Sequence, residues 1–334
     1  MRLSILGGAG FIGSNFVRHT QASTMRQSHV IDKLTYAGRR ENLIGYDLPL
    51  YEEDICNTDA LKTIFAKEKP DVVINFAAES HVSRSITNPE SFTRTNVVGA
   101  QSVLEAMRAS CPTARLIHIS TDEVFGQQSE WQKPWHDYDQ LNPRSPYAAS
   151  KAAGELLARS YFTTYGLDVI IVRPSNCFGQ NQFPEKLIPR AITNLIDGQK
   201  IKLMGEGLQM RDWLLVDDLC KKLNVIIEKG TAGECYNIPA NCIYRNRDIV
   251  GKILQYMGKT WDDVERIPHR LAHDFKYHVA GEGIDKLMGV ASTKTYFDYN
   301  LQSVLKWYVN NENWWRPLKE EAELGNQNDH KAGV

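Results

Sequence analysis

The sequence predicts an α/β protein in which a Rossmann-type, doubly wound parallel sheet is joined to a smaller C-terminal substrate-binding lobe. Short apolar, β-branched runs alternate with helical segments through the first half of the chain, which is typical of parallel strands joined by crossover helices. A glycine-rich turn directly follows the first apolar run and opens a helix, as in folds that bind dinucleotides.

The elements are predicted from hydrophobic periodicity and from cap residues. We expect strands at residues 3–6, 29–31, 50–51, 71–76, 116–119 and 168–173. We expect helices at residues 11–20, 59–68, 89–109, 147–165, 189–197, 217–229 and 246–257. In the second of these helices, Asn57 or Thr58 is the expected N-terminal cap, because both side chains accept hydrogen bonds from a helix N-terminus.

The strand and helix alternation becomes irregular after Arg173, where prolines and glycines separate shorter segments. We therefore expect residues 1–173 to form the dinucleotide-binding Rossmann domain. Residues 174–324 should form mainly the substrate-binding lobe, with some segments returning to the large domain. The polar residues 325–334 are expected to be a frayed tail.

The composition is that of an ordinary globular protein. The 334 residues are 42% hydrophobic and 24% charged, and a net charge of −1 indicates neither a nucleic-acid partner nor a membrane surface. The N-terminal apolar run is too short for a signal peptide, and no run of 18 apolar residues predicts a membrane span. The six cysteines have no zinc-binding spacing, so we expect a cytoplasmic protein with reduced thiols and no metal site.

The glycines at Gly7, Gly10 and Gly13 follow the first predicted strand and open a helix. Glycine lets the backbone turn tightly and approach a pyrophosphate, whose oxygens then accept hydrogen bonds from the helix N-terminus. Asp32 ends the next strand, where a carboxylate accepts hydrogen bonds from both ribose hydroxyls and repels a 2′-phosphate. The pattern favours NAD over NADP, although Lys33 and two nearby arginines oppose that preference.

A second group of residues predicts catalysis. Thr121, Asp122 and Glu123 directly follow an apolar strand, while Tyr147 and Lys151 lie four residues apart and so share one helix face. The ammonium should lower the pKa of the phenol and make it a base, and Thr121 can bind the same substrate hydroxyl. The two carboxyls are either loop caps or a general acid and base with separated pKa values. The functional interpretation is oxidation coupled to elimination.

Several motifs resemble those of the extended short-chain dehydrogenases/reductases. They occupy residues 7–14, 77–82, 120–124, 145–151, 183–189 and 211–214. Within that superfamily the chain is most similar to the nucleotide-sugar 4,6-dehydratases, above all the dTDP-glucose 4,6-dehydratase family, from the first strand to residues 314–319. The Thr-Asp-Glu triplet is the discriminating motif, because related epimerases and decarboxylases usually lack its acidic pair.

The resemblance implies NAD-dependent dehydration of a nucleotide-diphosphate hexose, dTDP-glucose or UDP-glucose, to the 4-keto-6-deoxy sugar. Tyr147 would remove the C4 hydroxyl proton while C4 gives hydride to NAD⁺. Glu123 would take the C5 proton, and Asp122 would protonate the departing C6 hydroxyl. Hydride would then return to C6, so NAD would remain bound as a prosthetic group. Thr121 and Lys151 complete the catalytic set.

The resemblance and the glycine motif also imply binding residues. The expected cofactor contacts are Gly7, Gly10, Phe11, Ile12, Gly13, Asp32, Asp54, Ile55, Ala77, Ala78, Asn96, Tyr147 and Lys151. The expected nucleotide-sugar contacts are His81, Ser83, Arg84, Asn176, Glu185, Lys186, Leu187, Arg211, Asn246, Arg270 and Tyr277. Asp54 could instead be a loop cap, and the charged substrate contacts could instead be ion pairs between the lobes. Arg211 and Arg270 are suited to bind a diphosphate.

In the resembled family, helices such as 89–109 and 147–165 pair across a two-fold axis, which implies a homodimer. The apolar residues Val97, Val98, Val103 and Leu104 fit that interface, but they equally fit packing inside the monomer.

The chain departs from the dehydratase pattern at Ser83, Phe125, Pro174, Cys177 and Leu219, and at four of the eight residues 270–277. Leu219 should delete a polar neighbour on the nucleotide side. These changes leave two alternatives open, which are an epimerase or other 4-keto chemistry on a different nucleotide sugar, and a non-catalytic NAD-binding regulator.

Overall fold

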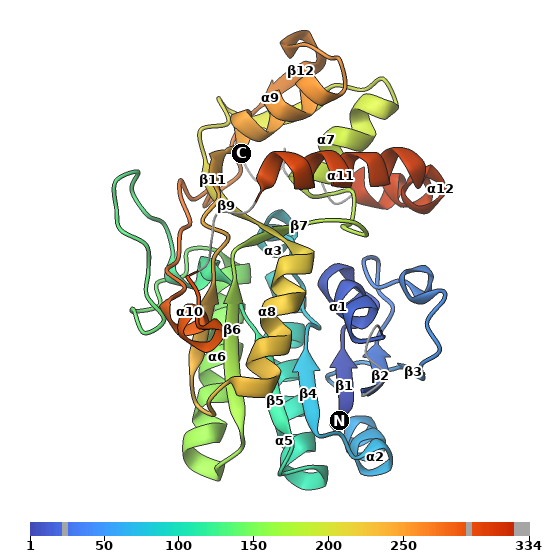
Figure 1. Ribbon diagram of the computed structural model, residues 1–334, viewed down its shortest axis with the longest axis vertical. Coiled ribbons are helices and arrows are strands. Elements are labelled where there is room, and N and C mark those ends of the chain that lie inside the picture. The colour runs from blue at the N-terminus through green and yellow to red at the C-terminus, as the bar shows by residue number, and fades with distance from the viewer. Residues whose placement is uncertain (22–25, 292–295, 324–334) are drawn as a thin grey trace.

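The computed structural model describes residues 1–21, 26–291 and 296–323, and it has a large sheet domain with a smaller lobe at one end (Figure 1). Seven strands form the large sheet in the order β10-β6-β5-β4-β1-β2-β3, and every neighbouring pair is parallel. The strands are β1 (Arg2–Leu6), β2 (Gln27–Asp32), β3 (Leu50–Glu52), β4 (Val72–Asn75), β5 (Arg115–Ile119), β6 (Val169–Pro174) and β10 (Cys235–Ile238). The predicted doubly wound Rossmann-type sheet is confirmed.

Helices cover both faces of the sheet, because successive strand residues point to opposite sides. In β1, Leu3 and Ile5 join the core beneath α1 (Phe11–Gln21) and α8 (Val216–Lys229), whereas Leu6 joins the core on the opposite face. The helices on that second face are α2 (Thr58–Glu68), α5 (Ala100–Ser110) and α6 (Pro146–Tyr165). Figure 1 shows α1 and α8 on the near side of the sheet.

The last strand of the large sheet comes from the second half of the chain. After β6 the chain enters the smaller lobe, and β10 then returns and pairs with β6, with Cys235 opposite Ile171. The lobe contains a three-stranded sheet of β7 (Asn176–Phe178), β9 (Met210–Leu215) and β11 (Ile243–Arg245), and a parallel pair of β8 (Ile201–Met204) and β12 (Val264–Ile267). Its helices include α7 (Leu187–Ile196), α9 (Asn246–Tyr256), α11 (Phe297–Asn310) and α12 (Glu312–Trp315), whereas α10 (Glu282–Met288) returns to the large domain and packs on β10 and α8.

The predicted helix over residues 89–109 is interrupted. The structure has α4 (Pro89–Thr93), then a wide π turn η2 (Arg94–Gly99), then α5. Within the π turn, the Asn96 amide donates to the Glu79 carbonyl (3.0 Å) and to Ser150 Oγ (2.9 Å). Widened turns of this kind redirect a side chain, and here Asn96 reaches both the loop after β4 and helix α6. A further short helix, α3 (Val82–Thr87), precedes α4.

Other predicted helices agree closely with the structure. Helix α2 begins at Thr58, and Asn57 caps it by accepting a hydrogen bond from the Ala60 amide (3.2 Å). Helix α6 begins at Pro146, and Ser145 Oγ accepts from the Ala148 amide (3.1 Å). These caps satisfy backbone amides that have no partner within the helix.

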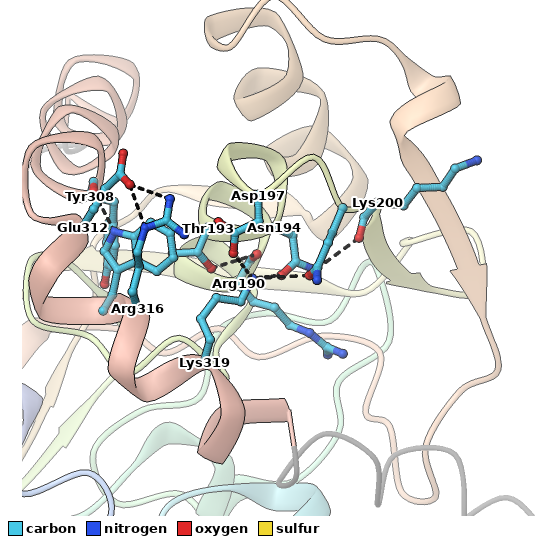
Figure 2. Close-up of polar contacts among 11 residues, drawn as sticks. Arg190, Thr193, Asn194, Asp197, Lys200, Tyr308, Glu312, Arg316 and Lys319 are labelled. Carbon is cyan, nitrogen blue, oxygen red and sulfur yellow. Dashed lines mark hydrogen bonds and ion pairs between the residues drawn. The ribbon is translucent and has the colours of Figure 1, made fainter.

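The segment after α11 fastens the smaller lobe to the large domain. In Figure 2, Arg316 and Lys319 reach α7, where Arg316 pairs with Asp197 (2.6 Å) and Lys319 donates to Asn194 Oδ1 (2.7 Å). On the other side, Trp314 donates to Asn42 Oδ1 (2.8 Å), beside the glycine turn.

The predicted tail at 325–334 lies outside the described residues. Among the described helices, none has the length and apolar character that crossing a membrane requires.

Candidate active site

The polar triplet lies where β5 reaches the edge of the sheet that faces the smaller lobe. Thr121 caps the short turn η3 (Asp122–Phe125), and its Oγ1 accepts from the Glu123 amide (3.3 Å). The same hydroxyl donates to Asp122 Oδ1 (3.2 Å). This cap fixes both carboxyl groups at the end of one strand, where all three side chains are buried.

Tyr147 and Lys151 reach the same place from the first turns of α6. The Tyr147 phenol shares a hydrogen bond with Thr121, and Lys151 Nζ donates to the Ile119 carbonyl (2.6 Å). The expectation that the ammonium lowers the phenol pKa is wrong for this arrangement. Burial raises the pKa of Tyr147, and the charge of Glu123 adds to that increase. Burial also lowers the pKa of Lys151 to about 8.

The surroundings of Asp122 and Glu123 act differently on the pKa values of their carboxyl groups. Burial raises the pKa of Asp122 well above its usual value, and the neighbouring Glu123 raises it further. Burial also raises the pKa of Glu123, but three cations oppose the increase, namely Arg270, Arg211 and Lys186. Asp122 therefore tends to keep its proton while Glu123 ionises more easily, which is the division needed between an acid and a base.

The glycine turn after β1 forms one wall of a long groove. Gly7 has φ +73°, and a Cβ there would lie 2.5 Å from the Ala77 amide nitrogen. A Cβ at Gly13 would lie 2.2 Å from the Gly7 carbonyl oxygen, so the turn and the start of α1 pack together only as glycines. The groove runs from this turn to the catalytic residues, and we call it the cofactor groove.

At its far end the cofactor groove is lined by acidic residues. Asp32 Oδ2 accepts from the Ala9 amide (2.9 Å) and Oδ1 from the Leu34 amide (2.8 Å), which fixes the carboxylate at the groove wall. Asp54 also lines the groove and pairs with Lys33 (2.7 Å). A glycine cradle at a helix start and a fixed carboxylate beyond it fit the pyrophosphate and ribose of NAD.

The structure brings nearly all of the expected cofactor contacts to this groove. Its lining includes Gly7, Gly10, Phe11, Ile12, Gly13, Asp32, Asp54, Ile55, Ala77, Ala78, Tyr147 and Lys151. Asn96 does not line it, because the Asn96 amide is engaged with Glu79 and Ser150. Ser150 Oγ in turn donates to the Tyr147 carbonyl (2.7 Å). Asn96 therefore supports the helix that carries the phenol.

A second cavity, the substrate pocket, opens from the catalytic end of the groove into the smaller lobe. The expected substrate contacts in its lining are His81, Ser83, Asn176, Glu185, Lys186, Leu187, Arg211, Asn246 and Arg270. Glu123 lines both the pocket and the groove, so the two cavities meet at this carboxylate. Burial, together with Lys186 and Arg270, lowers the pKa of His81 well below its usual value, so its imidazole is neutral.

Two of the expected substrate contacts point elsewhere. The Arg84 guanidinium stacks 3.8 Å from the centre of the Tyr36 ring and pairs with Glu185 (3.3 Å) and Glu321 (3.6 Å). Tyr277 is not part of the pocket lining, and its hydroxyl lies against Glu123 and Asp274. Arg84 thus corresponds to the alternative of an ion pair between the lobes, and Tyr277 lies behind the Glu123 carboxylate.

The pocket lining also contains residues that were not among the expected substrate contacts. They include Ser80, Gln182, Arg190, Lys202, Met204, Trp213 and His273. Two sequence signals could have found some of them. Arg190 follows Lys186 by one helical turn, and Lys202 and Met204 are two residues apart in a strand, where alternate side chains share a face.

The departures from the dehydratase pattern have different surroundings. Leu219 is fully buried in the core of the large domain, so the expectation that it borders the nucleotide is wrong. Phe125 is also core, and it stacks on Trp135 with ring centres 6.0 Å apart. Ser83, Pro174 and Cys177 line the cavities, and Cys177 lies where the groove and the pocket meet.

Among the described residues, no three side chains of His, Cys, Asp or Glu are grouped to hold a metal ion.

Comparison with known proteins agrees with this geometry. The model of the NAD dependent epimerase/dehydratase family matches residues 3–239. The chain is 41% identical to a dTDP-glucose 4,6-dehydratase of Streptomyces niveus over 332 residues, 97% of each chain. It is 37% identical to dTDP-glucose 4,6-dehydratase 1 of Escherichia coli (strain K12), which covers 96% of each.

A solved structure has the same fold. It is DesIV, a dTDP-glucose 4,6-dehydratase from Streptomyces venezuelae determined with NAD bound, and it superposes with a TM-score of 0.90. The two chains are 40% identical, and the match covers 95% of this chain and all of that one. On these sequence and structural matches, the chain belongs to the NAD-dependent epimerase/dehydratase family.

Proposed function

We propose that this protein is a nucleotide-diphosphate hexose 4,6-dehydratase whose substrate is dTDP-glucose. The observation that carries the proposal is the meeting of two chemical sets at one junction. Thr121, Tyr147 and Lys151 suit oxidation of a hydroxyl, and the electrostatically separated Asp122 and Glu123 suit removal of water. Proteins similar over nearly the whole chain are named dTDP-glucose 4,6-dehydratases, which supports the choice of nucleotide.

The residues act in a defined order. The residues of the cofactor groove would hold NAD, which would supply the hydride acceptor and donor and a positive charge that favours the phenolate form of Tyr147. Thr121 holds the substrate C4 hydroxyl, and Tyr147 accepts its proton. Glu123 then takes the acidified C5 proton, while Asp122 gives its proton to the leaving C6 hydroxyl. Lys151, fixed on the Ile119 carbonyl, orients the first turns of α6 around the phenol.

We also propose how the chain divides the two ligands. Residues 1–173, with segments that return from the second half, would bind NAD in the cofactor groove. Residues 174–324 would supply most contacts to the nucleotide sugar. Lys186, Arg211 and Arg270 line the pocket and give it the positive charge that a diphosphate requires. Asn246 and Leu187 also line this pocket.

Product mass tests the proposal. Purified protein is incubated with dTDP-glucose and, separately, with UDP-glucose, each with and without added NAD⁺. A product that has lost one water from dTDP-glucose is expected. An unchanged mass with a changed sugar stereochemistry would indicate an epimerase instead, and bound NAD without turnover of either sugar would indicate a binding protein.

We further propose a homodimer formed through α5, η2 and α6. Of the four apolar residues expected at the interface, Val103 and Leu104 pack in the monomer core. The four side chains therefore do not form one surface. Val98 and Leu156 are 46% and 54% exposed, and apolar side chains so exposed favour burial against a second copy. Sedimentation of the wild type and of Leu156→Arg tests this homodimer, with a dimer expected only for the wild type.

A cytoplasmic location is also proposed, because all six cysteines are free thiols.

A further inference from the structure

Three side chains connect the catalytic base to the protein surface. The Tyr277 hydroxyl lies 3.4 Å from Glu123 Oε2 and 2.7 Å from Asp274 Oδ2. Asp274 Oδ1 lies 3.1 Å from a guanidinium nitrogen of Arg144. The Asp274 side chain is 3% exposed and that of Arg144 is 44% exposed. The contacts therefore lead from a buried carboxyl group to a side chain in solvent.

The middle of this chain is held rigidly. Arg211 donates to the carbonyl oxygens of Asp274 (2.9 Å) and Phe275 (3.3 Å), and its guanidinium lies 4.4 Å from the centre of the Tyr277 ring. Burial raises the pKa of Tyr277, and the charge of Glu123 adds to the increase, so Tyr277 keeps its proton. A phenol between two carboxyl groups can accept a proton on one side while it donates one on the other.

The proposed dehydration gives this arrangement a task, and the inference rests on that function. Elimination leaves the C5 proton on Glu123, and C5 must receive a proton when C6 is reduced. Glu123 borders the junction of the groove and the pocket, which cofactor and substrate would fill. Bound cofactor and substrate would hinder exchange of bulk water through that junction during turnover, whereas Tyr277 lies outside the lining of both cavities.

We propose that Tyr277 and Asp274 relay the C5 proton between Glu123 and solvent. The C5–H bond breaks, its electron pair forms the C5=C6 double bond, and the C6–O bond breaks as Asp122 protonates the leaving oxygen. Glu123 then gives its proton to the Tyr277 oxygen while the Tyr277 proton moves to Asp274. Asp274 exchanges that proton with water beside Arg144, and a solvent proton returns by the same path to C5. No oxidant or reductant is consumed in the relay.

Isotope content tests the relay separately from activity. The full-length enzyme with NAD converts dTDP-glucose in D₂O, and NMR and mass spectrometry measure deuterium at C5 of the product. The wild type should place solvent deuterium at C5. Tyr277→Phe removes the hydroxyl, and Asp274→Asn keeps a hydrogen-bond acceptor that takes no proton. In both variants the product should retain mostly the substrate's own hydrogen. The kcat should fall by up to about a hundredfold, which is the smallest effect typical of losing a group that transfers a proton.

Tyr51→Phe is the matched control, because it removes a phenol-to-carboxylate hydrogen bond, to Glu68, far from the site. Its C5 deuterium should equal that of the wild type. The relay is overturned if either relay variant is slow yet incorporates deuterium as fully as the wild type, which would leave only a positioning role. It is also overturned if the wild type dehydrates the sugar but keeps the original C5 hydrogen, and in that case the proposed function stands. A wild type that forms no dehydrated product overturns both.

Discussion

Arg173 and Glu155 form an ion pair in the interior of the large domain, where their side chains are 1% and 0% exposed. Arg173 Nε donates to Glu155 Oε2 at 3.0 Å, and a second guanidinium nitrogen bonds the other carboxylate oxygen. Arg173 also donates to the Asp137 carbonyl (2.7 Å). The pair ties β6 to α6, the helix that carries Tyr147 and Lys151.

Breaking this pair should destabilise the protein strongly. Arg173→Met leaves the Glu155 carboxylate buried without its partner, which typically costs about 3–5 kcal/mol of the free energy of unfolding. The double variant Arg173→Met/Glu155→Leu removes both charges and should recover most of the loss. Urea unfolding of the three proteins measures the difference. A single variant as stable as the wild type would contradict this account.

Asp122→Asn should separate oxidation from elimination. The amide cannot donate a proton to the leaving hydroxyl, so product formation should fall by about 10²- to 10⁴-fold. Oxidation does not use this acid, so reduced nicotinamide should accumulate and be visible by its absorbance. Asp218→Asn is the control, because that carboxylate lies on α8 and pairs with Lys221. Undiminished product from Asp122→Asn would rule out the assigned role.

The same substitution should change how stability depends on pH. The pKa of Asp122 is raised in the folded protein, mainly by burial, above the value of about 3.9 expected when unfolded. Below that value both states carry the proton and its full contribution to stability is present. As pH rises toward the folded pKa, the unfolded state ionises first and stability is lost. Asp122→Asn lacks this loss, so its free energy of unfolding relative to wild type should increase as the pH rises above about 3.9 toward the raised folded pKa. A constant difference would argue against a raised pKa.

Gly13→Ala should weaken cofactor retention. The added Cβ would lie 2.2 Å from the Gly7 carbonyl oxygen, so the glycine turn must shift and its amides move away from a pyrophosphate. The NAD content of the purified protein, measured after denaturation, should fall. Gly251→Ala is the control, since its Cβ meets only the Trp261 ring at 3.6 Å and should stabilise α9 by about 0.5–1 kcal/mol. Equal NAD in both variants would contradict the proposed groove.

Much of the fold and the cofactor groove could be predicted because local patterns specify them. Buried parallel strands need apolar residues on both faces, and the turn after β1 needs glycine at Gly7 and Gly13. The position of Asp32 follows from the length of one crossover helix. These features depend on residues close in sequence, so their spacing is visible without a structure.

The rest depends on contacts between distant segments. Nothing near Arg84 indicates that Tyr36, Glu185 and Glu321 will surround it, so its motif position predicted a ligand contact instead. The pairing of β10 with β6 joins residues more than sixty positions apart. The spacing of Tyr147 and Lys151 predicted a lowered phenol pKa, but burial, which the spacing does not report, has the larger effect.

The late return of β10 also bears on how the protein is made. When residues 1–173 have been synthesised, the backbone groups of β6 that will pair with β10 form an open sheet edge. An open edge is a template for pairing with other chains. At ordinary translation rates, roughly 3 to 12 s pass before residues 235–238 are added. Nascent chains therefore expose this edge of β6 to other chains during that interval, and slower translation of the smaller lobe would prolong the exposure.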